Sequence, residues 1–145
     1  MAFEYTRTVR FHETDAAGVV YFANGLILCH EAYEASLGAA GIDLRQFFSR
    51  GSVAYPIVQA QIDFRRPLSC GDRVVISLTP RSIEATGYAI AYHLTLETDY
   101  TSSQDPASDR RSVATAYTQH VCISTADRAR QALPAEMTRW IEQFS

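Results

Sequence analysis

The order of the predicted elements indicates an α+β fold, in which one antiparallel sheet wraps around one long central helix. A strand pattern near the N-terminus is followed by a long apolar helix and then by several further strand patterns. Helix and strands are therefore segregated along the chain rather than alternating, which is typical of the α+β class. The long helix is apolar on nearly all sides, as expected of a helix enclosed by other structure. A chain of 145 residues suits one domain, residues 1–145.

The first half of the chain supplies the first strand and the central helix. Residues 3–11 alternate between apolar and polar side chains and predict a strand. A loop follows, and Asn24 is expected to cap a helix that runs over about 25–40 and is closed by Gly41. Residues 43–49 predict a second short helix or turn.

The second half of the chain is predicted as strands with a short terminal helix. The predicted strands cover residues 55–65, 73–79, 88–98 and 112–124. The polar, turn-rich stretch 99–111 predicts an exposed hairpin tip, and Pro134 opens a short amphipathic helix. Such a sheet has open edges and leaves the central helix half covered, so pairing with a second copy of the chain is expected.

Composition and charge argue against several classes of function. The net charge of −3, with 13 Lys plus Arg, argues against nucleic acid as a partner, because phosphate binding needs a concentrated basic surface. No run of about 18 apolar residues occurs, so no membrane span is expected. The N-terminal stretch lacks signal-peptide architecture, which favours the cytoplasm. Three dispersed cysteines and four dispersed histidines indicate neither a disulfide framework nor a metal site.

The stretch HETDAAGVVYFANG, residues 12–25, places a lone acid, Asp15, just ahead of the long helix. A carboxylate at this point could cap a helix, bind a metal or act as a catalyst. From the local sequence alone, a structural role in the turn is the commoner one for aspartate. The helix start beyond it offers free N–H groups at the positive end of the helix dipole, which could polarise a carbonyl group.

Residues 9–37, VRFHETDAAGVVYFANGLILCHEAYEASL, resemble the opening motif of hotdog-fold acyl-CoA thioesterases of the 4-hydroxybenzoyl-CoA thioesterase type. The pattern is a strand, then acid-x-Asp-x-x-Gly-hydrophobic-Val-aromatic, then the central helix. The resemblance extends through YPIVQAQIDFRRPLSCGD, residues 55–72, and TQHVCIS, residues 118–124. It implies a hotdog fold, thioester hydrolysis with neither a cofactor nor a metal, and assembly into a homodimer and further into a homotetramer.

The resemblance also implies a substrate class. The stretches GVVYF, CHEAYE, IDF, CGDR and HVCI look like the subgroup whose aromatic substrate is 1,4-dihydroxy-2-naphthoyl-CoA, an intermediate of phylloquinone synthesis. Some relatives carry a histidine seven residues after the catalytic aspartate, where this chain has Phe22. A histidine-assisted mechanism is therefore disfavoured, and an aryl-CoA substrate is compatible with Phe22.

The resemblance assigns roles to the residues around the motif. Asp15 would be the catalytic carboxylate, either attacking the thioester carbonyl directly or activating a water molecule. The backbone N–H groups of Tyr21 and Phe22 would hold the oxygen that becomes negative in the tetrahedral intermediate.

Binding of the acyl group and of CoA is expected to involve other parts of the chain. The residues expected to bind the acyl group are Gly18, His30, Tyr55 and Pro56. His30 would meet a ring hydroxyl of the substrate, and its alternative role is a core histidine satisfied by the backbone or by Glu34. Arg65 and Arg66 are the first candidates for CoA, followed by Arg73 and Arg81, with plain solvated charges as the alternative.

Three alternatives to an aryl-CoA thioesterase remain open at the level of sequence. A broad-range thioesterase for short or medium acyl groups would use the same Asp15. A hydratase or dehydratase would need a histidine and an acid facing one cavity, for which His30 and Glu31 are the nearby pair. A non-catalytic acyl-CoA-binding module would have no turnover for an Asp15 substitution to remove.

Overall fold

A computed structural model of the chain describes residues 1–100 and 112–145. The predicted hairpin tip at 99–111 therefore lies almost entirely outside the described residues. The strands are β1 (Phe3–Thr8), β2 (Val53–Ala54), β3 (Ile57–Phe64), β4 (Arg73–Glu84), β5 (Gly87–Leu96), β6 (Ser112–Val121) and β7 (Ile123–Ser124). The helices are α1 (Phe22–Ala39) and α2 (Ala135–Phe144), and short helical turns occupy η1 (Phe11–Glu13), η2 (Gln46–Arg50) and η3 (Glu97–Asp99).

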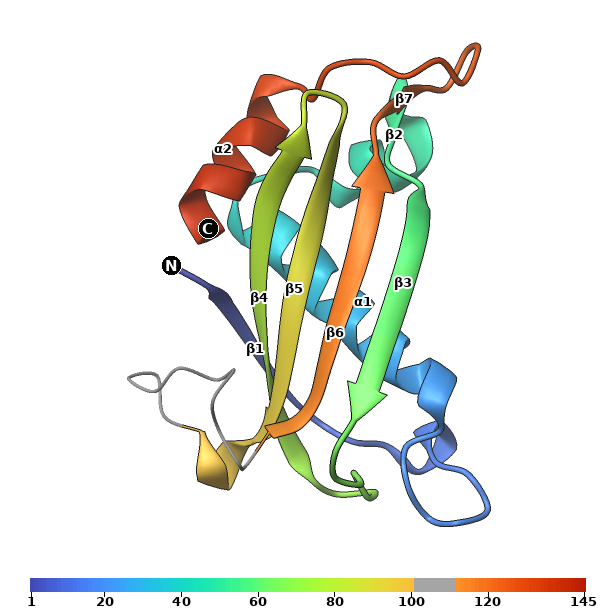
Figure 1. Ribbon diagram of the computed structural model, residues 1–145, viewed down its shortest axis with the longest axis vertical. Coiled ribbons are helices and arrows are strands. Elements are labelled where there is room, and N and C mark those ends of the chain that lie inside the picture. Colours follow the sequence, from blue (N-terminus) through green and yellow to red (C-terminus); the bar gives the residue numbers. More distant parts are fainter. Residues whose placement is uncertain (101–111) are drawn as a thin grey trace.

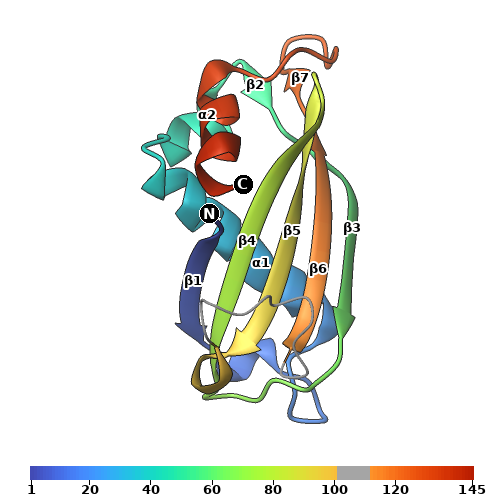
Figure 2. The ribbon, with the colours of Figure 1, turned by 60° about the vertical axis from the view of Figure 1, so that its left-hand side comes forward.

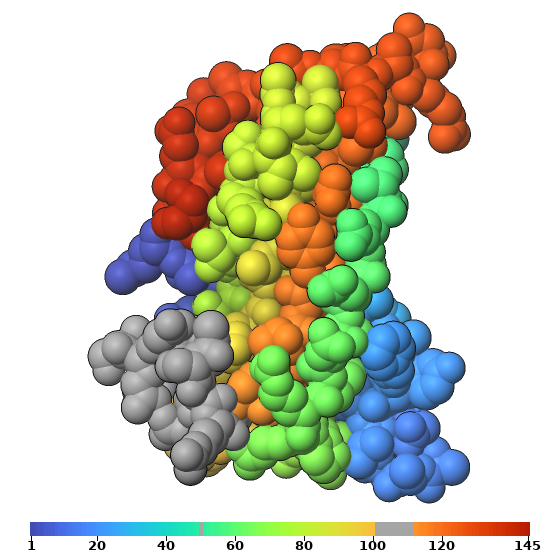
Figure 3. All heavy atoms as spheres, viewed as in Figure 1, coloured from blue at the N-terminus to red at the C-terminus, as the bar shows by residue number. Residues whose placement is uncertain are grey.

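One antiparallel sheet with the strand order β1-β4-β5-β6-β3 forms the body of the molecule. The helix α1 crosses one face of this sheet, with β1 at one edge and β3 at the other (Figure 1). A second view shows that the strands curve around α1 (Figure 2). The opposite face carries side chains of β3 to β6, and no helix of residues 1–100 or 112–145 lies over it (Figure 3). The α+β arrangement expected from the sequence is confirmed.

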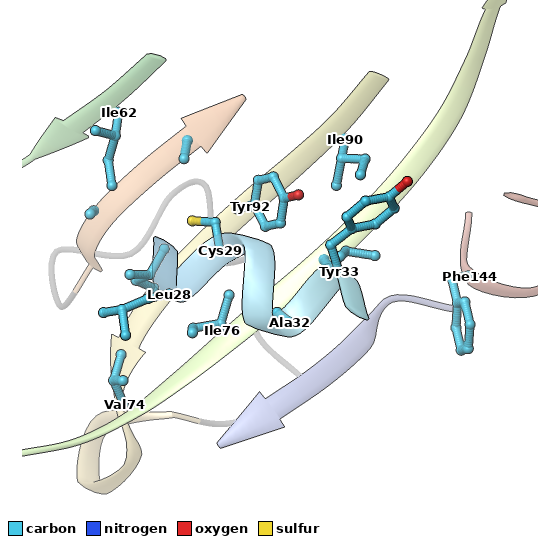
Figure 4. Packing of buried hydrophobic residues seen from close by; sticks show 14 of the residues in the cluster. Leu28, Cys29, Ala32, Tyr33, Ile62, Val74, Ile76, Ile90, Tyr92 and Phe144 are labelled. Atoms are coloured by element: carbon cyan, nitrogen blue, oxygen red, sulfur yellow. The ribbon is translucent and has the colours of Figure 1, made fainter. Parts of the chain in front are cut away.

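The core lies between α1 and the inner face of the sheet (Figure 4). Because side chains of a strand alternate between its faces, every second residue of β4 and β5 points at the helix. The fully or nearly fully buried residues in this layer include Leu28, Cys29, Ala32, Tyr33, Ile62, Val74, Ile76, Ile90 and Tyr92. Burial of each large apolar side chain contributes about 1.5–3 kcal/mol, so this layer fixes α1 against the sheet.

The first turn of α1 packs very closely on β3. A Cβ atom added at Gly25 would lie 2.7 Å from Cδ1 of Ile62 and 2.8 Å from Cζ of Phe64. A larger residue at this point would push the helix away from the strand or displace both side chains. The absence of a side chain at Gly25 therefore places the start of α1 beside the end of β3, where the candidate site lies.

The predicted start of the central helix is wrong by one turn. The helix begins at Phe22 with Tyr21 as its N-cap residue, and Asn24 lies inside the first turn. The Nδ2 group of Asn24 donates to the backbone oxygen of Glu13 at 2.9 Å instead of capping. A long-range contact thus uses the side chain that the local pattern assigned to the cap, and tertiary packing starts the helix earlier than the local sequence indicates.

Several strand boundaries also differ from the predicted ones. The first strand ends at Thr8 rather than at residue 11, because residues 11–13 form the helical turn η1. The strand predicted at 73–79 continues to Glu84, and the one predicted at 112–124 is interrupted at Cys122. The two-residue strand β7, which follows this interruption, pairs with β2 outside the main sheet.

The central helix is not fully enclosed within one chain. Ile27 on α1 is 53% exposed, and Val58 on the neighbouring edge strand β3 is 55% exposed. Phe22 and Ile57, on the same two elements, are also exposed. The helix's all-round apolar sequence therefore reflects a side that a single copy leaves open to solvent.

Candidate active site

Asp15 lies in a tight turn between η1 and α1. Its backbone N–H donates to the oxygen of Val19 at 2.9 Å, and its carbonyl oxygen accepts the N–H of Gly18 at 2.9 Å. Gly18 has φ +80°, a conformation that L side chains rarely adopt, so the turn depends on glycine. The Asp15 carboxylate accepts the N–H of Ala17 through Oδ1 at 2.9 Å. The turn-forming role is therefore real, and it leaves the second carboxylate oxygen without a hydrogen bond to the described residues.

A cavity of about 400 Å³ opens beside this carboxylate, and we call it the Asp15 pocket. It is formed by the turn, the start of α1 and the segment that leaves β3. Its lining residues are Asp15, Val19, Val20, Phe22, Phe64, Arg65, Arg66, Pro67 and Leu68. The structure thus brings the predicted catalytic acid, one predicted backbone donor and both preferred arginines to one place.

The backbone amides at the helix start are not equivalent. The N–H of Tyr21 donates to the carbonyl oxygen of Glu13 at 2.9 Å, and that of Asn24 donates to the oxygen of Tyr21 at 2.8 Å. Tyr21 is therefore wrong as a predicted donor to substrate, because its amide is already engaged. Phe22 is the first residue of α1 and has no intrahelical carbonyl to bind. Its amide, which also carries the positive end of the helix dipole, remains the candidate donor.

A second cavity, of about 380 Å³, lies at the opposite end of β3, and we call it the aromatic pocket. It lies between the middle of α1, the turn η2 and the start of β3. Its lining residues are His30, Tyr33, Phe47, Phe48, Ala54, Tyr55, Pro56, Ile57, His120, Ile123, Thr125 and Arg128. The predicted acyl-binding residues His30, Tyr55 and Pro56 all lie here.

The two cavities are too far apart to hold one acyl group within a single chain. The aromatic pocket includes Ile57, where β3 begins, and the Asp15 pocket includes Phe64, where β3 ends. A strand of this length spans about 24 Å, and Figure 1 shows the turn η2 and the start of α1 near opposite ends of β3. The structure therefore separates Asp15 from His30, Tyr55 and Pro56 within one copy.

His30 is half-exposed at the pocket rather than buried in the core. Its Nδ1 lies 3.1 Å from Oε1 of Glu34, one helical turn away. Glu31, in contrast, binds Arg7 and Tyr5 on another side of α1. His30 and Glu31 thus do not face one cavity, which removes the geometric basis of the hydratase alternative.

His120 on β6 forms part of the aromatic pocket, although it is not among the functional residues predicted from the sequence. Its ring stacks on Tyr88 with centroids 4.6 Å apart, and its Nε2 lies 2.9 Å from Oγ1 of Thr118. Burial lowers the pKa of His120 to about 4, so the ring is neutral at neutral pH. Burial also raises the pKa of Tyr33, whose hydroxyl is hydrogen-bonded to that of Tyr88 behind the pocket. The two-residue alternation of β6 is the signal that could have found His120.

The low pKa of His120 predicts a loss of stability in mild acid. Because the folded-state pKa lies below the ordinary value of about 6.5, the unfolded chain takes up this proton first as pH falls. We expect His120 to lower the free energy of unfolding progressively between pH 6.5 and 4, by up to about 3 kcal/mol.

Urea unfolding of the wild type and of His120→Gln across this pH range measures the effect. The variant should show a flatter dependence of stability on pH, whereas His12→Gln, at an exposed histidine, should follow the wild type. Parallel pH profiles for wild type and His120→Gln would contradict the prediction.

The arginines expected to contact CoA divide into two groups. Arg65 and Arg66 line the Asp15 pocket, and Arg66 also lies 3.6 Å from Oδ2 of Asp99. Arg73 is paired with Glu97 at 2.6 Å and, like Arg81, does not line this pocket. The preferred pair is thus the one that the structure places beside Asp15.

The described residues lack two features that other kinds of function would need. No group of three or more potential metal-binding side chains occurs among residues 1–100 and 112–145. No helix in the same part of the chain is long and apolar enough to cross a membrane.

Known proteins resemble this chain over almost its whole length. The sequence profile of the thioesterase-like superfamily matches residues 9–141. The chain belongs to this superfamily. It is 49% identical to the 1,4-dihydroxy-2-naphthoyl-CoA hydrolase of Nostoc punctiforme over 98% of this chain and 88% of that protein. It is 44% identical to the enzyme of the same name from Trichodesmium erythraeum, over 99% of this chain and 98% of that protein.

A solved structure gives the same result for the fold. The crystal structure of a 1,4-dihydroxy-2-naphthoyl-CoA thioesterase from Synechocystis superposes with a TM-score of 0.83 at 36% identity. The match covers 97% of this chain and 96% of that one. The resemblance to hotdog thioesterases and the predicted hotdog fold are thereby confirmed.

Proposed function

We propose that this chain hydrolyses 1,4-dihydroxy-2-naphthoyl-CoA to 1,4-dihydroxy-2-naphthoate and CoA, a step of phylloquinone synthesis in the cytoplasm. The observation that carries the chemistry is the Asp15 pocket, where an aspartate and the amide of Phe22 meet. The substrate is proposed from the names of relatives that are 49% and 44% identical over nearly the whole chain.

The reaction requires attack on the thioester carbonyl and departure of CoA as a thiolate. Asp15 acts in one of two ways. It attacks the carbonyl carbon to give a mixed anhydride that water then hydrolyses, or it removes a proton from the attacking water. In both routes the C–S bond breaks, and the oxygen of the tetrahedral intermediate becomes negative. In this proposal the amide of Phe22 donates to that oxygen and stabilises it.

The active site is completed by a second copy of the chain. Among the described strands, β3 is an edge strand with one neighbour, β6, and it carries the exposed residues Ile57 and Val58. Ile27 of α1 is exposed as well. If two β3 strands pair antiparallel, the start of one lies beside the end of the other. The aromatic pocket of one copy then meets the Asp15 pocket of its partner, and an acyl group between them can reach both. Two such dimers would form the predicted homotetramer.

A charge on β3 should separate the copies and remove activity. We expect Val58→Lys to convert the dimer to a monomer and to lower kcat/KM by at least about 100-fold, because neither pocket is then complete. Analytical ultracentrifugation and the thioesterase assay measure the two effects. Ile83→Lys, at an exposed apolar residue near the far end of β4, should change neither. A monomeric Val58→Lys variant with full activity would rule out the shared site.

CoA is proposed to lie along the segment that follows β3. Arg65 and Arg66 line the Asp15 pocket, and their guanidinium groups suit the CoA phosphates. Of the two, Arg65 is the first candidate, because Arg66 already lies near Asp99. Gly18 contributes by holding the turn that carries Asp15, since its positive φ lets the chain double back there.

A panel of acyl-CoA substrates tests the proposed function. Release of free thiol should be at least about ten-fold faster, in kcat/KM, with a hydroxynaphthoyl-CoA than with hexanoyl-CoA, which corresponds to about 1.4 kcal/mol. Similar rates on the two substrates would instead support the broad-range thioesterase. Binding without release of thiol above the uncatalysed rate would support the acyl-CoA-binding module.

A further inference from the structure

Glu13 is a buried carboxylate within an otherwise exposed loop. It stands two residues before Asp15, at the first acidic position of the family motif, and only 5% of its surface is exposed. Both Nη atoms of Arg7 donate to its carboxylate oxygens at 2.7 Å. The backbone N–H of Arg10 donates to Oε1 at 2.7 Å. Such charge-assisted and bidentate hydrogen bonds are short and strongly directional, so the side chain has one defined position.

The backbone of Glu13 joins the turn to the start of the helix. Its carbonyl oxygen accepts the N–H of Tyr21 at 2.9 Å and the Nδ2 group of Asn24 at 2.9 Å. Thr14 and Val20 form a β-bridge directly beyond this point. Glu13 therefore connects the two ends of the segment 13–21, which carries Asp15. Its hydrogen bond to Tyr21 lies one residue before the Phe22 amide.

The ion pair extends this anchor to the sheet and to the middle of the helix. Nη1 of Arg7, on β1, also donates to Oε2 of Glu31 on α1 at 2.8 Å. The hydroxyl of Tyr5, on the same strand, donates to Oε1 of Glu31 at 3.2 Å. The loop, the edge strand β1 and the helix α1 thus share one network of buried and half-buried charges.

We propose that Glu13 is a positioning residue, which sets the separation between the Asp15 carboxylate and the Phe22 amide. This inference rests on the proposed function. Asp15 must attack, or activate water, on one side of a carbonyl whose oxygen lies against Phe22. A displacement of about 1 Å between such groups can lower a rate by about 100-fold. Glu13 does not touch the substrate and acts through the geometry of its neighbours.

The test compares Glu13→Ala with the conservative Glu13→Gln. The alanine variant keeps Arg7 paired with Glu31, and an amide oxygen in the glutamine variant can still accept the Arg10 N–H. We expect Glu13→Ala to lower kcat by about 30- to 100-fold while KM stays within about three-fold. Glu13→Gln should recover kcat to within about five-fold of the wild type. Circular dichroism and thermal unfolding establish that each variant is folded at the assay temperature.

Glu84→Ala provides the matched control. It removes a carboxylate that pairs with Arg130 at 2.9 Å at the end of β4 and lines neither pocket, and it should leave kcat unchanged. The inference is overturned if folded Glu13→Ala retains the kcat of the wild type or loses activity only through KM. It is also overturned if Glu13→Gln lowers kcat as much as Glu13→Ala does. An inactive wild type, or an Asp15→Asn variant as active as the wild type, would instead overturn the proposed function, whatever Glu13 does.

Discussion

Replacement of Asp15 by asparagine is expected to lower kcat for thioester hydrolysis by about 1,000-fold or more, with a small change in KM. Asparagine has nearly the same shape, and its Oδ1 can still accept the N–H of Ala17 that holds the turn. The amide can neither attack a carbonyl as a carboxylate does nor take a proton from water. The variant therefore removes the proposed chemistry and keeps the local fold.

The chain offers a matched control for this substitution. Asp43 also accepts backbone amides in a turn, from Arg45 at 2.9 Å and Gln46 at 3.3 Å, but it does not line the Asp15 pocket. Asp43→Asn should retain the activity of the wild type. The two variants and the wild type are compared by release of free thiol under saturating and limiting substrate. An Asp15→Asn variant that keeps most of its kcat would show that this residue is only a turn former.

The architecture could be predicted from the sequence because it depends on periodicity. Alternation along β4, β5 and β6 and the long apolar segment of α1 are local patterns with one simple arrangement, a sheet around a helix. The helix start could not be predicted in the same way. Tyr21 makes no side-chain cap, and the amide of Tyr21 is satisfied by the carbonyl oxygen of Glu13, eight residues earlier. Capping rules consider only residues next to the helix end, so they cannot identify the carbonyl oxygen of Glu13 as the partner.

The candidate site could be predicted only in part. The family motif pointed to Asp15, and the structure places it with Phe22 and the two arginines of the segment after β3. No pattern in the sequence indicated that His30 and Tyr55 belong to a different cavity, at the other end of β3. That separation is set by strand length and by the path of α1. It is also what turns the expected self-association into a requirement of the proposed site.

The burial of Glu13 could not be predicted from the sequence. Glutamate is rarely buried unless it is paired, and its partner, Arg7, lies on a separate strand. In the sequence, Glu13 is one polar residue of a polar loop, and Arg7 is one polar residue of an alternating strand. Only the pairing of β1 with the rest of the sheet brings them together.

Removal of Arg7, the partner of Glu13, should lower the stability of the chain more than the loss of an exposed ion pair. We expect Arg7→Met to lower the free energy of unfolding by about 3–5 kcal/mol, because it leaves a buried carboxylate without a countercharge. The Arg7 and Glu13 side chains are 13% and 6% exposed, so water cannot replace the lost partner. Urea unfolding followed by circular dichroism measures the change.

The exposed pair between Arg73 and Glu97 tests whether burial, rather than ion pairing as such, determines this effect. Its N–O distance of 2.6 Å is as short as that of Arg7 and Glu13, but its side chains are 54% and 49% exposed. Arg73→Met should therefore change stability by no more than about 1 kcal/mol. Adding Glu13→Gln to Arg7→Met should restore part of the lost stability, because the uncompensated charge is then gone. Equal losses from the two arginine variants would mean that desolvation of Glu13 is not what makes the buried pair necessary.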